Sequence, residues 1–510
     1  MRLINTALFS IVMALPASAQ EGPLSAIDWL GAHTPVTVAQ PRIMRPGEPP
    51  VTGGVTVPDV AVMPLDDAVP DAVGLLPQST TGLPPTLWEN SRASRIVTRL
   101  NLLPDHPLPA TQALYYTLLL AEAEPPNDIT SGAPLLKARV KALRRFGAVA
   151  PARALLERAG PQRIEVFDQW LDLALLDGAE DTPCRALAEN PALSSDYAAR
   201  IFCIARAGDW TTAALTFDTA QALGVLPRTQ VALLAQFLDP EAIEGTLDLA
   251  PPNDMSPLTF RLYEAVGRAM PTRNLPRAFA MADLRGTAGW KAEVEAAERL
   301  ASTGALPANR LLGLYTDRKP AASGGVWDRV EAVQAFDRAL TREDPDKIAQ
   351  TLPPVWSAMQ DQGLAVVFAE MFGASLAEQN LSGRAQTLAL RIGLLSPAYE
   401  AAAQRIGAQS PLAFHAGLAQ GAPKADLAQS PDQKAIFRAF TATGPAPRDA
   451  ALLEENKLGE AILAAATRLD RAGPAASDDL TAALLTLRAV GLEDTARRAA
   501  LQRLLLDTQP

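Results

Sequence analysis

The sequence predicts an all-α protein, an α-solenoid of helical hairpins preceded by a Pro-rich, mostly extended N-terminal segment. The chain has 510 residues, of which 48% are hydrophobic but only 5% aromatic. Its apolar residues are chiefly alanine and leucine, which favour helices. From Leu87 onward they recur at intervals of three and four positions, with glycine or proline breaks roughly every 15 to 25 residues. Because so long a chain exceeds one ordinary core, two or three domains or a stack of repeats is expected.

Internal copies of a repeat pattern support the solenoid. The segment from Gly208 to Ala220 (GDWTTAALTFDTA) resembles the tetratricopeptide signature, in which small residues let one helix approach the next and a large residue fills the gap. Residues 147–159 repeat this spacing, and residues 383–395 are a weaker copy. No strict period of about 34 residues holds. The fold class is therefore a tetratricopeptide-like α-solenoid without a regular array.

The first residues have the features of a cleaved signal peptide. Arg2 supplies a positive charge, Ala7 to Leu15 form an apolar core, and residues 17–19 (ASA) form a cleavage site. The apolar stretch is shorter than the roughly 20 residues that span a bilayer, and no later apolar run reaches that length. We expect release into the periplasm without stable membrane insertion; the alternative is a retained, uncleaved anchor.

Residues 20–85 differ in composition from the rest of the chain. Prolines recur throughout, so no long helix is expected, and we expect the segment to be extended and partly disordered. Apolar pieces lie between them, among which Ile27, Trp29 and Leu30 are candidate partner-binding residues. Such motifs dock either on the helices of this protein or on a partner. We expect residues 71–83 to lie against the first helices and residues 25–30 to form a short, loosely held helix.

The chain therefore divides into four predicted segments. A break rich in glycine and charge near residues 318–325 separates two helical lobes. The segments are the signal peptide (1–19), the Pro-rich segment (20–85), the N-terminal helical-repeat lobe (86–320) and the C-terminal helical lobe (321–510).

Several short motifs resemble an uncharacterised family of exported alphaproteobacterial helical-repeat proteins. They are SAIDWL (residues 25–30), DAVGLLP (71–77), GLP (82–84) before Trp88, the two spaced cysteines, and GLEDTAR (491–497). The resemblance covers most of the chain and implies export and helical repeats, but no activity. Some members carry an antifreeze-type label. An ice-binding surface needs a regular lattice of exposed threonine, and the sequence has none.

Charge excludes one class of partner. The net charge is −10 and the isoelectric point is about 5.1, whereas nucleic-acid binding requires a basic footprint. A local exception runs from Lys137 to Arg145, where five cations alternate with apolar residues. We interpret it as the solvated face of a helix; the alternative is contact with anionic lipid or a cell-wall polymer.

The two cysteines predict one disulfide, as is usual in an exported chain. Cys184 lies at the start of one short helical stretch and Cys203 late in the next. In an antiparallel pair of helices these two ends meet. A reactive thiol pair is the alternative, but the C-x-x-C spacing that it normally uses is absent. We therefore expect a structural disulfide.

No catalytic or metal-binding constellation is evident. The three histidines, His33, His106 and His415, have no ligand partner at metal-binding spacing, and no local signature of acyl transfer or nucleotide hydrolysis occurs. We expect no metal and no cofactor, and a buried or half-buried structural role for His415. Acidic residues are plentiful, so a carboxylate pair for glycoside hydrolysis stays open, although the sequence selects none.

Residues 314–329 are the most site-like stretch. They mix aromatic, charged and glycine residues, which interface hot spots favour. The alternative is a connecting loop in which Ser323 caps the next helix and Asp317 pairs locally with Arg318 or Arg329. The candidate partner-binding residues here are Tyr315, Asp317, Arg318, Lys319, Trp327 and Arg329.

The expected function follows from these features. We expect a periplasmic scaffold or adaptor that binds an envelope protein or peptide and catalyses no reaction of its own. The alternative is a cell-wall polysaccharide-binding or lytic enzyme.

Overall fold

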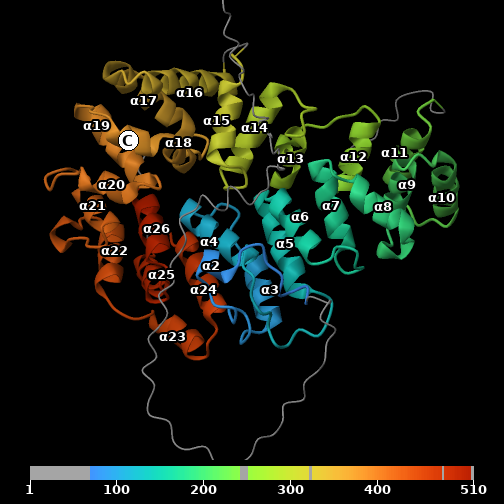
Figure 1. The fold of residues 1–510 in the computed structure, drawn as a ribbon, viewed down its shortest axis with the longest axis horizontal. Helices are drawn as coiled ribbons and strands as arrows, with labels where there is room; N and C mark the ends of the chain where they lie inside the picture. The colour runs from blue at the N-terminus through green and yellow to red at the C-terminus, as the bar shows by residue number, and fades with distance from the viewer. Residues whose placement is uncertain (1–68, 242–250, 321–323, 474–475, 507–510) are drawn as a thin grey trace, which may run out of the picture. The chain divides into compact units, whose positions relative to one another are not determined.

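The computed structural model describes residues 69–241, 251–320, 324–473 and 476–506, and its fold there is all-α (Figure 1). These ranges contain no β-strand; an isolated parallel bridge joins Leu76 to Ala121. The all-α prediction is confirmed for this part of the chain. None of its helices combines the length and the apolar character that crossing a bilayer requires.

The helices fall into three groups in chain order. The first group comprises α2 (Gln78–Thr81), α3 (Ala93–Asn101), α4 (Pro109–Leu120), α5 (Pro134–Phe146), α6 (Val149–Arg158), α7 (Phe167–Asp177), α8 (Asp181–Glu189), the 3-10 helix η1 (Pro191–Leu193), α9 (Tyr197–Arg206), α10 (Trp210–Ala222) and α11 (Arg228–Leu238). The second comprises α12 (Pro257–Ala265), η2 (Thr272–Asn274), η3 (Arg277–Phe279), α13 (Ala280–Asp283), α14 (Trp290–Ala301), α15 (Ala308–Thr316) and α16 (Val326–Thr341). The third comprises α17 (Pro345–Gln360), α18 (Ala365–Glu378), α19 (Gly383–Leu395), α20 (Tyr399–Gln404), α21 (Ala413–Ala419), η4 (Ala425–Leu427), α22 (Pro431–Thr441), α23 (Pro447–Glu454), α24 (Leu458–Arg471), α25 (Ser477–Ala489) and α26 (Glu493–Leu506).

Proline and glycine residues mark the ends of several of these helices. Proline occupies the first turn of several helices, including α4 and α5, where its missing N–H group has no helical partner to lose. Gly147 ends α5 in the left-handed region (φ +86°). A Cβ atom there would lie 2.6 Å from Cδ2 of Leu300. Gly147 therefore lets α14 approach the end of α5.

Several helices pack against the next helix in the chain, among them α5 with α6, α8 with α9, α9 with α10, and α18 with α19. The segment with the clearest repeat signature covers α10. The buried residues of α10 are Ala213, Phe217 and Ala220, which occupy the small, large and small positions of the signature. The inward face of this segment was therefore predicted correctly. That the helices form a tetratricopeptide-like solenoid stays a prediction.

Helices near the two ends of the described chain, α4 and α26, pack against each other (Figure 1). The backbone N–H of Ala110 in α4 donates to Oε1 of Gln502 in α26 over 2.8 Å. Asp470 in α24 accepts hydrogen bonds from the N–H of Leu108 (3.0 Å) and from the hydroxyls of Thr111 and Tyr115 (2.6 Å each). The beginning and the end of the described chain thus share one core.

The end of the Pro-rich segment docks on the first helices. The N–H groups of Leu75 and Leu76 both donate to the carbonyl of Leu120, over 2.8 and 2.9 Å. Asp71 accepts a hydrogen bond of 2.6 Å from the N–H of Leu136. The prediction that residues 71–83 lie against the first helices is confirmed. The signal peptide and the motif with Ile27, Trp29 and Leu30 lie outside the described residues.

The basic run on α5 is not uniformly solvated. Arg139 is 1% exposed, and its guanidinium donates to backbone carbonyls of the docked segment and of the end of α4. Arg144 pairs with Asp172 over 2.7 Å. The interpretation of this run as a solvated face is therefore wrong for Arg139. Its position explains why, because Arg139 lies four residues from the buried Leu135 and Leu143 and shares their face of the helix.

Candidate functional site

Two residues of the site-like stretch at 314–329, Tyr315 and Arg329, form a buried triad with Glu298. Glu298 in α14 accepts from Arg329 in α16 through both carboxylate oxygens, over 2.6 and 2.5 Å. It also accepts a 2.7 Å hydrogen bond from the hydroxyl of Tyr315. All three side chains are buried. Burial acts to lower the pKa of Arg329, but its hydrogen bonds to Glu298 outweigh this effect and raise the pKa. Neither Tyr315 nor Arg329 therefore presents its polar group to a partner.

The other candidates in this stretch lie nearer the surface. Asp317 and Arg318 form an exposed ion pair of 2.9 Å, as the local-pairing alternative expected, and Lys319 is exposed. The half-buried Trp327 packs against Trp290, with ring centroids 4.8 Å apart. Ser323 lies outside the described residues. The partner-binding prediction for this stretch therefore rests on Asp317, Arg318 and Lys319.

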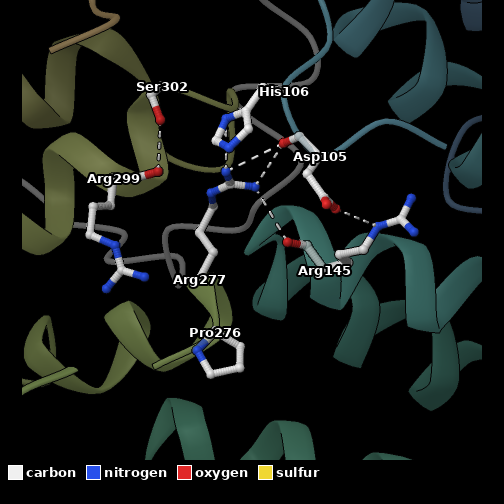
Figure 2. Close-up of a pocket in the computed structure, with 7 residues that line it drawn as sticks. All are labelled: Asp105, His106, Arg145, Pro276, Arg277, Arg299 and Ser302. Carbon is white, nitrogen blue, oxygen red and sulfur yellow. Dashed lines mark hydrogen bonds and ion pairs between the residues drawn. The ribbon is translucent and has the colours of Figure 1, made fainter. Parts of the chain in front are cut away.

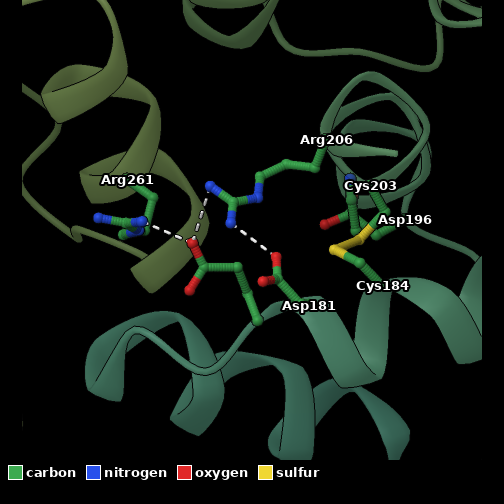
Figure 3. Close-up of a disulfide and its surroundings, with 8 residues drawn as sticks. Asp181, Cys184, Asp196, Cys203, Arg206 and Arg261 are labelled. Atoms are coloured by element: carbon green, nitrogen blue, oxygen red, sulfur yellow. Dashed lines mark hydrogen bonds and ion pairs between the residues drawn. A yellow bond between two sulfur atoms is a disulfide. The ribbon is translucent and has the colours of Figure 1, made fainter. Parts of the chain in front are cut away.

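The two cysteines are joined, as the sequence predicted. Cys184 in α8 and Cys203 in α9 form a disulfide with a Cα–Cα distance of 4.8 Å (Figure 3). Beside it, the buried carboxylate of Glu180 accepts from Arg261 over 2.6 Å and pairs with Arg206 over 3.4 Å. Covalent and ionic links thus fix α9 on α8 and connect this hairpin to α12.

Removing the disulfide is expected to destabilise the protein. A Cys184→Ala, Cys203→Ala double variant should lose about 3 kcal/mol of unfolding free energy, because the unfolded chain regains the entropy that the loop closure removed. Thermal unfolding followed by circular dichroism measures the change. A reductant should lower the melting temperature of the original protein but not of the double variant. An unchanged melting temperature in the double variant would contradict a stabilising role.

The helix that packs on this hairpin exposes apolar side chains. Among the described residues, seven large hydrophobic side chains are exposed, and four of them lie between residues 210 and 225. We call these four the α10 surface: Trp210, Leu215, Leu223 and Val225. The ring of Trp210 is half exposed and rests against Phe237 of α11, with centroids 5.7 Å apart. The α10 surface thus includes a large aromatic side chain that the protein already holds in place.

A second candidate is a recess of about 510 Å³ that three arginines line (Figure 2). Its wall is built from segments far apart in sequence: the loop between α3 and α4, the end of α5, the start of η3 and the end of α14. We call it the arginine recess, and its lining residues are Asp105, His106, Arg145, Pro276, Arg277, Arg299 and Ser302.

The three guanidiniums are held mainly by backbone carbonyls. Arg145 donates to the carbonyls of Asn101 and Leu103 over 2.9 and 2.7 Å. Arg299 donates to those of Thr272 and Leu275 over 2.8 and 2.9 Å. These bonds orient the side chains, but a carbonyl carries no net charge and does not itself compensate the positive charge of a guanidinium.

Arg277 lies between the other two arginines and has the longest contacts. It donates to the carbonyls of Asp105 and Arg145 over 3.4 Å. One terminal nitrogen of Arg277 lies 3.4 Å from Nδ1 of His106. Because a guanidinium can only donate, Nδ1 is the acceptor of this hydrogen bond. Asp105 is the one carboxylate among the lining residues, and it pairs with Arg145 over 3.4 Å.

Burial and mutual repulsion both act on these cations. Burial lowers the pKa of Arg145, Arg277 and Arg299. The positive charge of Arg145 lowers the pKa of Arg277 further, while Asp105 acts to raise it. The charge of Arg277 lowers the pKa of Arg299, while Asp283 acts to raise it. The recess therefore holds more positive charge than its own carboxylate compensates, on a chain whose net charge is −10.

The arginine recess was not predicted from the sequence. Its arginines lie at positions 145, 277 and 299, and only Arg145 belongs to a run that the sequence marks as basic. The other two lie outside any basic run. Only the packing of α5, η3 and α14 brings them together.

Within the described ranges, no cluster of three or more His, Cys, Asp or Glu residues has the arrangement of a metal site. His415 is buried in α21, as the sequence predicted. Burial and the nearby Arg391 lower its pKa to about 4. His415 is therefore a neutral core residue at pH 7.

Comparison with known proteins gives no assignment, because no protein-family model, no curated protein and no solved structure matches this chain.

Proposed function

We propose that the protein is a periplasmic helical-repeat scaffold or adaptor that binds a protein or peptide partner and has no catalysis of its own. The observation that carries this proposal is the α10 surface, with four exposed large apolar side chains within 16 residues of sequence. Exposed apolar area costs about 25 cal/mol per Å² in water. Exposed large apolar side chains that are concentrated in one part of a chain are candidates for an interaction surface.

The way this surface is held supports recognition of a partner. The helix α10 packs on α9, which the disulfide joins to α8. A rigid support lowers the entropy cost of binding, because the binding residues are already positioned. Trp210, which rests on Phe237, has the size and preorganisation of a hot-spot residue. The partner that fits is a peptide or protein segment with large apolar side chains of its own.

Two features support the periplasm as the compartment. The disulfide between Cys184 and Cys203 is typical of oxidising compartments, and the first 19 residues have the pattern of a cleaved signal peptide. Export places the α10 surface where envelope proteins and cell-wall polymers are available.

The test compares substitutions inside and outside the α10 surface. A Leu215→Ser, Leu223→Ser double variant and an Ile164→Ser control are expressed in the native host and crosslinked in the periplasm. Ile164 is the matched control because it is 67% exposed, as is Leu215, and lies outside the α10 surface. We expect the double variant to lose at least about tenfold in partner recovery, whereas the control retains it.

Two outcomes would contradict the proposal. Equal recovery by the double variant and the control would show that the α10 surface binds no partner. Sedimentation with purified cell-wall sacculi, with release of soluble fragments, would favour the polysaccharide-directed alternative instead.

A further inference from the structure

We propose that the arginine recess binds a small organic dianion, a dicarboxylate or a phosphate monoester. This inference is independent of the α10 surface, because the recess is built from α5, η3, α14 and the loop before α4, none of which contributes to that surface. Failure of either proposal leaves the other untouched.

The charge of the recess determines the charge of the ligand. Three arginines and one carboxylate line it, so two positive charges are in excess when His106 is neutral. Asp105 is paired with Arg145 and also attracts Arg277, and Asp283, which is not a lining residue, attracts Arg299. Among the lining residues, neither Arg277 nor Arg299 forms an ion pair with a carboxylate. A dianion would compensate both charges and relieve the repulsion that acts between these arginines.

The geometry provides donors for oxyanions. Each terminal nitrogen of Arg299 carries two N–H groups and donates one hydrogen bond to a backbone carbonyl. The second N–H group of each nitrogen can therefore donate to an anion. Arg277 makes only long contacts of 3.4 Å, which an anion would replace at little energetic cost. Guanidiniums bind carboxylates and phosphates through paired, charge-assisted hydrogen bonds.

The size of the recess determines the size of the ligand. A volume of about 510 Å³ falls within the range of about 300 to 1,000 Å³ of small-molecule sites. It far exceeds the volume of a single inorganic ion. Pro276 and the methylene stems of the arginines provide apolar wall, which an organic body of a few carbons would cover.

The test is isothermal titration calorimetry of the purified protein at low ionic strength with two probes, succinate and glycerol 3-phosphate. We expect saturable binding of at least one probe at a stoichiometry of one, weakened by added NaCl because salt screens the attraction. The probe that binds more tightly identifies the ligand as a dicarboxylate or a phosphate monoester. No saturable heat with either probe up to about 50 mM would overturn the proposal.

Two variants with opposite expected effects identify the site. Arg277→Gln should weaken binding at least about tenfold. Asp105→Asn removes the one lining carboxylate and should strengthen binding about threefold. Arg228→Gln, at an exposed arginine of α11, is the matched control and should leave the affinity unchanged.

The Asp105→Asn variant keeps the proposal testable even if Arg277→Gln fails to fold. Asp105 is a largely exposed loop residue, so its replacement by the isosteric amide leaves the fold intact. A purely structural role of these residues predicts no gain of affinity in Asp105→Asn. Equal affinities of the original protein, Arg277→Gln and Asp105→Asn would place the anion elsewhere and overturn the proposal.

Discussion

Replacing Arg139 by leucine is expected to lower the free energy of unfolding by about 3–5 kcal/mol. The guanidinium donates to the carbonyls of Leu119 (2.6 Å), Val73 (2.7 Å) and Ala121 (2.9 Å). Burial lowers the pKa of Arg139 to about 10, so the side chain stays charged at pH 7. Leucine fills part of the space but leaves these carbonyls without a donor in a buried environment, where each unsatisfied group costs about 1–3 kcal/mol.

Urea denaturation followed by far-ultraviolet circular dichroism measures this loss. Arg144→Leu is the matched control on the same helix, because its ion pair with Asp172 is about one third exposed. Such a pair contributes about 0–1 kcal/mol. If Arg139→Leu cost no more than this control, the docked segment would not depend on Arg139. Limited proteolysis gives a second measurement, with faster cleavage near residues 71–76 expected in the Arg139→Leu variant.

The features that could be predicted from the sequence are local. Helical periodicity depends on residues three and four apart, so it identifies helices without knowledge of their partners. Cys184 and Cys203 are 19 residues apart, within one hairpin, and their pairing requires only that two neighbouring helices be antiparallel. The docking of residues 71–83 follows from apolar residues next to prolines that exclude them from a long helix.

Contacts between distant segments could not be predicted. Ala110 and Gln502 are 392 residues apart, and many helices of this chain offer similar apolar faces of alanine and leucine. Nothing in such a face specifies which other helix it meets. The arginine recess was missed for the same reason, since Arg145, Arg277 and Arg299 come from three separate elements.

Arg139 is a case in which the sequence did contain the signal. An arginine placed among Leu135, Leu136, Ala142 and Leu143 at helical spacing lies on the apolar face of the helix. A cation at such a position must find hydrogen-bond acceptors within the protein, because burying an unpaired charge is costly. The charges of the run, taken together, indicated a solvated face, whereas the position of Arg139 in the helix places this one cation on the buried face.

Glu298→Gln is the second substitution for which a large effect is expected, again about 3–5 kcal/mol of unfolding free energy. Glutamine keeps the shape of the side chain but removes the negative charge that both nitrogens of Arg329 contact, over 2.5 and 2.6 Å. Arg329 then stays buried as a cation without a counter-charge in this triad. The hydroxyl of Tyr315 also loses a charged acceptor at 2.7 Å.

The location of this triad makes the prediction informative about the two predicted lobes. Glu298 lies before the break at residues 318–325 and Arg329 after it, so the ion pair crosses the predicted boundary. Asp317→Asn is the matched control, because the pair of Asp317 with Arg318 lies in the same stretch but is more than half exposed. We expect that control to cost less than about 1 kcal/mol.

A Glu298→Leu, Arg329→Leu double variant separates the charge effect from the loss of packing. Replacing both members of a buried ion pair by apolar residues is often neutral, whereas removing one leaves a buried, unpaired charge. Chemical denaturation of Glu298→Leu, Arg329→Leu and the double variant gives the coupling free energy between the two residues. We expect the double variant to be more stable than Glu298→Gln, because no charge then stays buried without its partner. If it is instead as unstable as the sum of the two single variants, the two side chains act independently, and the triad does not hold α14 and α16 together through its charges.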